Sequence, residues 1–234
     1  MNIDRENFRH VENQCTFPIT KTQTNIFLFG GSTTFGVGVS DQETIASRLQ
    51  FTLRENGCKV CVYNFGVGGF LSTQERIYFE QLIINEQIPD IAIFIDGFND
   101  FVVARDKDEP LFTPDLKRYM EKSGSVAIHL KALLFQLPVT GLAYRYKGDI
   151  IFPPTDKNMS PLIERWFRNK NLIDNVGEDY NISTLFVIQP ISIFKYNLNH
   201  SLVAKGDTNK IAIGKVKSLQ GYPTFFEHYR KNKD

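Results

Sequence analysis

The sequence predicts an α/β fold in which helices cover both faces of a mostly parallel sheet. Short apolar runs alternate along the chain with segments of helical periodicity, and this alternation is typical of parallel sheets. Three of the apolar runs end in glycine and polar residues, at positions 30–36, 64–69 and 96–100. The carboxyl ends of parallel strands share one edge of the sheet, so these three loops should lie together.

The first half of the chain supplies three of the predicted strands. Residues 25–29 are an apolar run that stops at two glycines. A helix should follow within residues 40–57, because this segment opens with a capping-box pattern and then repeats apolar residues at four-residue spacing. The second strand, residues 60–65, leads into another capping-box helix over residues 72–87. The third strand, residues 91–95, is uninterrupted apolar sequence, as expected for a strand buried on both faces.

The second half is less regular. Residues 101–158 contain a charged stretch and several prolines, and we interpret them as an insertion that borders the site. A helix over residues 161–176 and a strand over residues 184–188 restore the alternating pattern. After Pro190 the chain becomes polar, with a last helix predicted within residues 215–230.

Length and charge favour one soluble domain. A chain of 234 residues suits a single α/β domain, here residues 23–234 preceded by an N-terminal extension over residues 1–22. The 27 basic and 26 acidic residues nearly balance, which argues against nucleic acid or an anionic membrane as a partner. The sequence shows neither a membrane span nor the apolar core of a signal peptide, so the expected location is the cytoplasm.

The three cysteines favour free thiols. Cys15, Cys58 and Cys61 are an odd and sparse set, which fits a reducing compartment better than a disulfide scaffold. Cys58 and Cys61 have the spacing of redox and zinc motifs, but residues three apart on a strand point to opposite faces. No second pair completes a zinc site, so we expect packing or surface cysteines and no bound metal.

Ser32 is the candidate nucleophile, because it lies in the glycine loop that follows the first strand. Other motifs fit this loop poorly. The positions after Gly36 lack the Lys and Ser/Thr of a phosphate-binding loop, and Leu71 stands where a dinucleotide fingerprint needs its third glycine. A Gly-x-Ser-x-Gly elbow is also missing around Ser32. The sequence therefore implies no nucleotide, flavin or nicotinamide cofactor.

The three loops, in this order, resemble the SGNH (GDSL-like) hydrolases, a family of esterases and lipases. The resemblance assigns Ser32 as the nucleophile, and Gly69 and Asn99 as donors of the oxyanion hole. Gly31 stands where the family name implies aspartate, but that aspartate is not the catalytic acid. The family's Asp-x-x-His block, which supplies the triad acid and base, has no match in the sequence.

The resemblance implies a three-layer α/β/α fold of the flavodoxin-like SGNH type, with the last strand and helix missing. It also implies cleavage of carboxylic esters, either of small molecules or of acylated glycans. Two alternatives stay open. One is acyl transfer to a glycan hydroxyl, and the other is a truncated or degenerate domain without catalysis. The substrate and the oligomeric state are not encoded in any pattern that we recognise.

Each candidate also has a structural interpretation. Ser32 could cap a helix, Gly69 could serve only a tight turn, and Asn99 or Asp100 could hold a loop or cap a helix. The enzymatic interpretation requires Asn99 to lie within about 10 Å of Ser32, since both must flank one carbonyl group.

The catalytic base is the gap in the sequence. We expect that none of the four histidines reaches Ser32. We also expect an uncovered sheet edge beside residues 184–188, which would favour aggregation. The histidines are His10, His129, His200 and His228.

Overall fold

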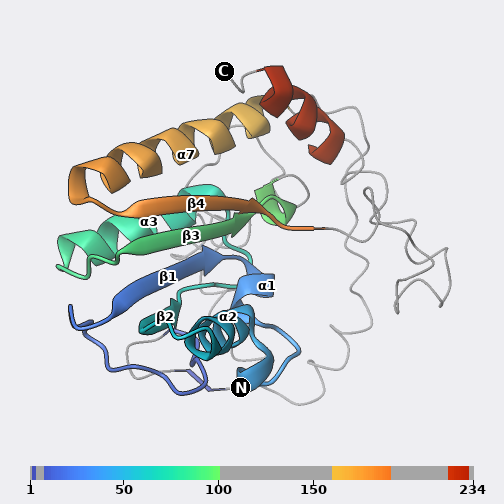
Figure 1. Cartoon of the computed structure of the whole chain (residues 1–234). Coiled ribbons are helices and arrows are strands. Elements are labelled where there is room, and N and C mark those ends of the chain that lie inside the picture. Colours follow the sequence, from blue (N-terminus) through green and yellow to red (C-terminus); the bar gives the residue numbers. More distant parts are fainter. Residues whose placement is uncertain (1, 4–7, 101–159, 191–220, 232–234) are drawn as a thin grey trace, which may run out of the picture. The chain divides into compact units, whose positions relative to one another are not determined.

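A parallel sheet organises the protein. The computed structural model describes residues 2–3, 8–100, 160–190 and 221–231. The sheet contains β1 (Thr24–Gly30), β2 (Val60–Asn64), β3 (Ile91–Asp96) and β4 (Ser183–Ile188), in the order β2-β1-β3-β4 (Figure 1). All three pairings are parallel, so the predicted α/β class is confirmed. The predicted insertion and the residues His129 and His200 lie outside the described residues.

Helices lie on both faces of the sheet (Figure 1). α2 packs its apolar stripe against Ile26, Leu28 and Val62 on one face, and α3 and α7 pack on the other. The helical elements are α1 (Ser32–Phe35), the 3-10 turn η1 (Asp41–Glu43), α2 (Ile45–Glu55), α3 (Ser72–Ile84), α7 (Ser160–Tyr180) and a helix over residues 221–231.

Two predicted helix starts need correction. Ser40 and Glu43 do form a capping box, but it caps the start of the η1 turn. The residue that caps α2 is Thr44. At α3 the predicted cap, Ser72, is already the first helical residue. A propensity pattern fixes a helix start only within a turn, because neighbouring loops compete for the same polar side chains.

The strand order reverses at β1. The chain places β2 on one side of β1 and then returns to place β3 on the other. In open parallel sheets, ligands bind in the crevice at such a reversal, beyond the carboxyl ends of the strands. Ser32 follows β1 and Asn99 follows β3, so the topology puts both residues at this crevice.

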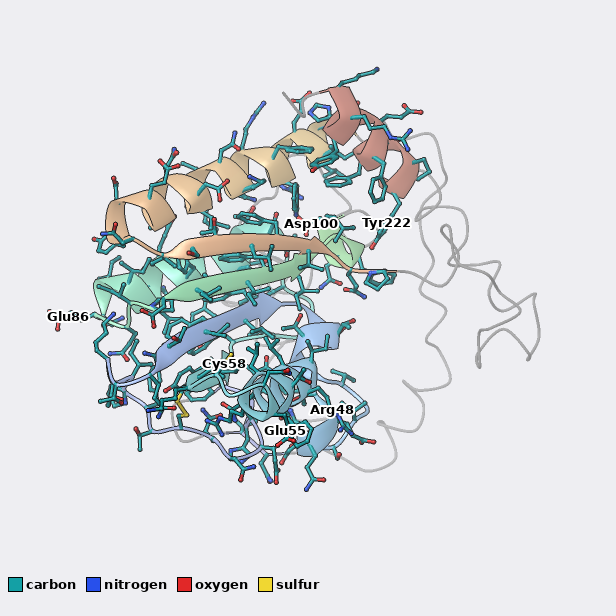
Figure 2. All side chains as sticks on the ribbon, in the orientation of Figure 1. Arg48, Glu55, Cys58, Glu86, Asp100 and Tyr222 are labelled. Atoms are coloured by element: carbon teal, nitrogen blue, oxygen red, sulfur yellow. A yellow bond between two sulfur atoms is a disulfide. The ribbon has the colours of Figure 1, made fainter. Side chains whose placement is uncertain are left out.

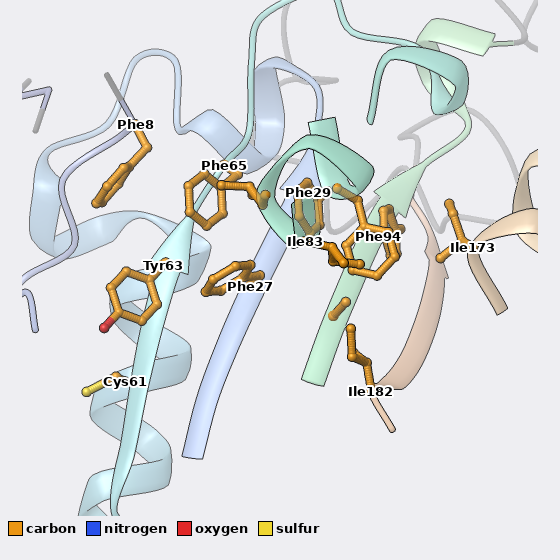
Figure 3. Close-up of a cluster of buried hydrophobic side chains, with 13 residues drawn as sticks. Phe8, Phe27, Phe29, Cys61, Tyr63, Phe65, Ile83, Phe94, Ile173 and Ile182 are labelled. Carbon is orange, nitrogen blue, oxygen red and sulfur yellow. The ribbon is translucent and has the colours of Figure 1, made fainter. Parts of the chain in front are cut away.

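Aromatic rings fill the face of the sheet that α3 and α7 cover (Figure 3). Phe27 packs edge-on to Phe65 with ring centroids 4.7 Å apart, and Phe29 stacks on Phe94 at 4.8 Å. Phe79 of α3 meets Phe94 at 5.5 Å. Such pairs add stability beyond their buried area, and they tie the ends of β1 and β3 together just below the polar loops.

The cysteine prediction is wrong. Cys15 and Cys61 form a disulfide, and only Cys58 is free and exposed. The partners are 46 residues apart, and they meet because the segment that carries Cys15 packs beside β2, a long-range contact that local spacing cannot reveal. Disulfides are typical of oxidising compartments, so the cysteines no longer support a reducing one.

β4 forms one edge of the described sheet. On the face away from α7, Leu185 is 51% exposed and Val187 is 37% exposed. Within the described ranges no strand pairs with the outer side of β4, and the uncovered edge expected there stays a prediction. No helix in these ranges is both long and apolar enough to cross a membrane.

Candidate active site

Ser32 begins the short helix α1 directly after β1. Gly31 holds the cap position, so the Ser32 hydroxyl is not used as a helix cap. The side chain is half-buried, and in the described part of the chain its hydroxyl makes no hydrogen bond. It is therefore available to a bound molecule.

Close backbone approach explains two of the glycines around Ser32. A Cβ on Gly30 would lie 2.8 Å from the carbonyl oxygen of Ile95, at the end of β3. A Cβ on Gly66 would lie 2.5 Å from the backbone nitrogen of Phe35. The end of β1 thus packs closely on the backbone of β3, and the loop after β2 packs closely on the backbone of α1, so a side chain at either glycine would separate its pair of segments.

Asn64, the last residue of β2, ties the first two loops together. Its Nδ2 donates to the Thr34 carbonyl at 2.8 Å, and its Oδ1 accepts from the Gly66 N–H at 3.0 Å. The side chain is fully buried. No motif singled out Asn64, although an asparagine at the end of a buried strand is a signal that could have identified it.

Asn99 joins the third loop to the other two. Its Nδ2 donates to the Phe70 carbonyl at 2.7 Å and would lie 2.3 Å from a Cβ on Gly31. Since consecutive Cα atoms are about 3.8 Å apart, Asn99 Nδ2 lies within about 8 Å of the Ser32 Cα. An amide nitrogen has two hydrogens, so one remains for a ligand after Phe70 has taken the other.

Gly69 lies in the same loop as Phe70. Its φ of +84° favours glycine, and no atom of the described residues lies within 4 Å of the position where a Cβ would be. Its N–H has no acceptor within the described residues. The half-buried peptide therefore presents a free donor beside an open space.

Asp100 holds the start of α3, the helix that follows the Gly69 loop. Its carboxylate accepts from the Ser72 N–H at 3.2 and 3.3 Å and from the Ser72 hydroxyl at 2.6 Å. Asn169 of α7 donates to the Ser72 hydroxyl at 3.0 Å and to the Thr73 hydroxyl at 2.8 Å. The alternative of a helix cap for Asp100 is thus supported, but the helix that it caps is α3.

Two further carboxyls are buried beside Asp100. Burial, and then the charge of Asp96, raise the pKa of Asp100 to about 6, although hydrogen bonds from Ser72 and the charge of Arg165 oppose this. Burial also raises the pKa of Asp96, and burial together with the Asp96 charge raises that of Glu75 well above its usual value. Asp96 accepts a hydrogen bond from the Trp166 indole at 3.1 Å.

Arg9 supports the other side of the site. Its fully buried guanidinium donates to the carbonyls of Phe35 at 3.1 Å and Val39 at 3.3 Å, and forms an ion pair with Asp41. Its backbone N–H donates to the Asn64 carbonyl. Arg9 belongs to the predicted N-terminal extension, and no sequence pattern indicated its role.

The two described histidines do not contact Ser32. His228 packs on Phe167, with ring centroids 4.9 Å apart, and His10 bonds to Asn2 through its backbone N–H. In the described ranges no base therefore reaches the Ser32 hydroxyl, and no group of three His, Cys, Asp or Glu side chains is placed to hold a metal ion.

Solved structures similar to this chain are esterases, but the similarity is slight. Esterase AlinE4, described as an SGNH-hydrolase family esterase, is 17% identical, with 82% of this chain and 84% of AlinE4 covered and a TM-score of 0.34. The esterase EstA from Pseudoalteromonas sp. is 12% identical, with 87% and 99% covered and a TM-score of 0.38. The acetyl xylan esterase AlAXEase is 16% identical, with 70% and 77% covered and a TM-score of 0.33. No family model and no curated protein matches the sequence.

Proposed function

We propose that the protein cleaves carboxylic esters through Ser32. The observation that carries this assignment is the position of Asn99, whose amide bridges Gly31 and Phe70 and keeps one hydrogen free beside the serine loop. The Gly69 N–H and the Asn99 amide would donate to the carbonyl oxygen as it gains negative charge. One such donor typically contributes about 3–4 kcal/mol to lowering the barrier.

The reaction would proceed in two steps. The Ser32 oxygen adds to the ester carbonyl carbon, the bond to the alcohol oxygen breaks, and the alcohol leaves with the serine proton. Water then attacks the acyl-serine and releases the acid. If a sugar hydroxyl replaces water in the second step, the same site performs acyl transfer.

Removal of the proton from the Ser32 hydroxyl should limit the rate of ester hydrolysis. A serine hydroxyl needs a base within about 3 Å, and the described residues place none there. Loss of one triad member can reduce turnover by about 10⁶. We therefore expect slow hydrolysis of a short activated ester, well below an ordinary turnover of about 10 per second.

The decisive experiment combines turnover with labelling. Wild type should hydrolyse p-nitrophenyl acetate and should be labelled by a fluorophosphonate at Ser32, as located by peptide mass spectrometry. Ser32→Ala should lose both. Asn99→Ala should keep the fold and lower turnover by about 10²–10³, because it removes one oxyanion donor.

The absence of a base beside Ser32 among the described residues favours a second candidate, a domain that binds an acyl ester without cleaving it. It predicts that wild type and Ser32→Ala bind the ester equally and that neither is labelled nor turns it over. Label on any residue other than Ser32 would contradict both candidates.

A further inference from the structure

The strongest feature outside the three site residues is the link between Asp100 and the loop that carries Gly69. Asn99 and Asp100 are consecutive, and both form hydrogen bonds with the short segment between β2 and α3. Asn99 donates to the Phe70 carbonyl, and Asp100 accepts two hydrogen bonds from Ser72. The segment between β2 and α3 is therefore held on both sides of Leu71 by neighbouring residues of the β3 loop.

We propose that Asp100 is a positioning residue that fixes the Gly69 loop only while its carboxylate is ionised, so that pH regulates the oxyanion site. This role presupposes the ester-cleaving function proposed above and adds a regulation of that site. Asp100 touches neither Ser32 nor a substrate and acts through Ser72 and Phe70.

The hydrogen bonds from Ser72 favour the ionised form of Asp100. Ser72 offers two donors to Asp100, its N–H and its hydroxyl, because the hydroxyl oxygen already accepts from Asn169. An ionised carboxylate has only acceptor sites, whereas the protonated form carries a hydrogen on one oxygen. Protonation therefore places an O–H donor next to the Ser72 donors and weakens the hydrogen bonds between Ser72 and Asp100. A negative charge also suits the N-terminal end of a 13-residue helix such as α3.

Charged and titratable groups face Asp100 from each described element around it. Glu75 comes from α3, Asp96 from β3 and Arg165 from α7. Tyr222 comes from the C-terminal helix, which lies beside Asp100 (Figure 2). Among the described residues the buried guanidinium of Arg165 has no hydrogen-bond partner, and it acts on Asp100 through its charge. Burial and the Asp96 charge place the change of ionisation near pH 6.

Backbone NMR tests this role without reference to activity. In wild type, the Ser72 amide should titrate with a midpoint near pH 6, and the Gly69 amide and the Asn99 side-chain amide should follow with the same midpoint. Asp100→Asn keeps the shape but replaces one acceptor oxygen by a donor, and it should abolish all three titrations. A Ser72 titration that Gly69 and Asn99 do not follow would reduce Asp100 to a local cap and overturn the proposal.

A matched control is available at the opposite end of the sheet. Asp90 also accepts a hydrogen bond from a backbone N–H, that of Asn25 at 2.7 Å, where β1 begins. Asp90→Asn is the same chemical change at the other end of β3 from the loop, and it should leave the three titrations intact. Loss of the titrations in this variant as well would contradict a specific role for Asp100.

Kinetics then links positioning to regulation. Asp100→Asn should lower Ser32-dependent kcat by about 10- to 100-fold at pH 8 with little change in KM, since a misplacement of 1 Å can cost about 10². Its kcat should also lose the rise near pH 6. Ser72→Ala removes the hydroxyl, and with it one donor to Asp100 and one acceptor from Asn169, but keeps the N–H donor; it should show a smaller loss with the rise retained.

The outcomes separate the two proposals. Absence of any Ser32-dependent turnover in wild type rejects the ester-cleaving function, while the NMR titrations still decide the positioning role. Turnover in wild type that Asp100→Asn leaves unchanged in both kcat and pH profile rejects the positioning role alone.

Discussion

The two sides of the candidate site are held by buried charges of opposite kinds. On the serine side, Arg9 donates to the carbonyls of Phe35 and Val39 and fixes the turn that follows Ser32. On the oxyanion side, Asp100 accepts from Ser72 and fixes the loop that follows Gly69. Both charged side chains are almost fully buried.

Arg9 and Asp100 differ in whether a change of pH can neutralise the buried charge. A guanidinium stays protonated at any pH that the fold survives, so the serine side has a permanent support. The carboxyl of Asp100 changes its ionisation near pH 6. We infer that pH acts on the oxyanion side and leaves the position of Ser32 unchanged.

The largest expected effect comes from breaking the permanent support. Arg9→Met removes the guanidinium from Asp41 and from the backbone carbonyls of Asn2, Phe35 and Val39, and it should lower the free energy of unfolding by about 3–5 kcal/mol. Arg165→Met is the matched control, because it removes a buried guanidinium that makes no hydrogen bond to any residue that the structure describes. It should change stability far less in the same urea titration. Equal losses for the two variants would mean that burial, and not the contacts of Arg9, determines the effect.

The disulfide belongs to the serine side, because it fixes the segment that carries Arg9. Replacing Cys15 and Cys61 together by serine opens a loop with a sequence separation of 46 and should cost about 2–4 kcal/mol. Cys58→Ser removes only an exposed thiol and should leave stability unchanged. The same urea titration, with and without reductant, measures both. A reductant effect in the double variant would point away from this disulfide.

Asp100 should affect stability and activity with opposite signs. Its pKa is raised on folding from about 3.8 to about 6, so its contribution favours the folded state fully below about pH 4 and is lost as pH rises through 6. The loss amounts to as much as about 3 kcal/mol, at 1.36 kcal/mol per pKa unit. The Ser32-dependent kcat should rise over the same pH interval. The difference in unfolding free energy between wild type and Asp100→Asn, measured from pH 4 to 7, isolates this group. A flat difference would show that Asp100 is already ionised at pH 4.

Local patterns in the sequence predicted most of the fold and named three candidate site residues. The four strands were predicted because each is a short apolar run bounded by glycine or polar residues. Ser32, Gly69 and Asn99 stood out because each follows such a run. Their placement at one edge follows from parallel topology alone.

The supports of the site were missed for a physical reason. Arg9 reaches Phe35 across 26 positions, and Asn169 reaches Ser72 across 97. Such contacts depend on how distant segments pack, and no periodicity or motif encodes them. Asp100 was noticed as a helix cap, but only the structure shows that it caps α3, which precedes it in the sequence.

Gly31→Ala should have the smallest effect on the free energy of unfolding and yet a large effect on kcat. A Cβ at this position meets only the Nδ2 atom of Asn99 at 2.3 Å, the end of a side chain that can move, and the φ of −83° suits alanine. Gly31→Ala should therefore change the free energy of unfolding by less than about 1 kcal/mol. The displaced amide should nevertheless leave the carbonyl oxygen with one donor fewer, and kcat should fall by about 10²–10³. Gly66→Ala provides the contrast, since its Cβ meets the Phe35 backbone at 2.5 Å and must destabilise the fold. If Gly31→Ala retained full kcat, Asn99 would not be an oxyanion donor, and only the serine side would remain assigned.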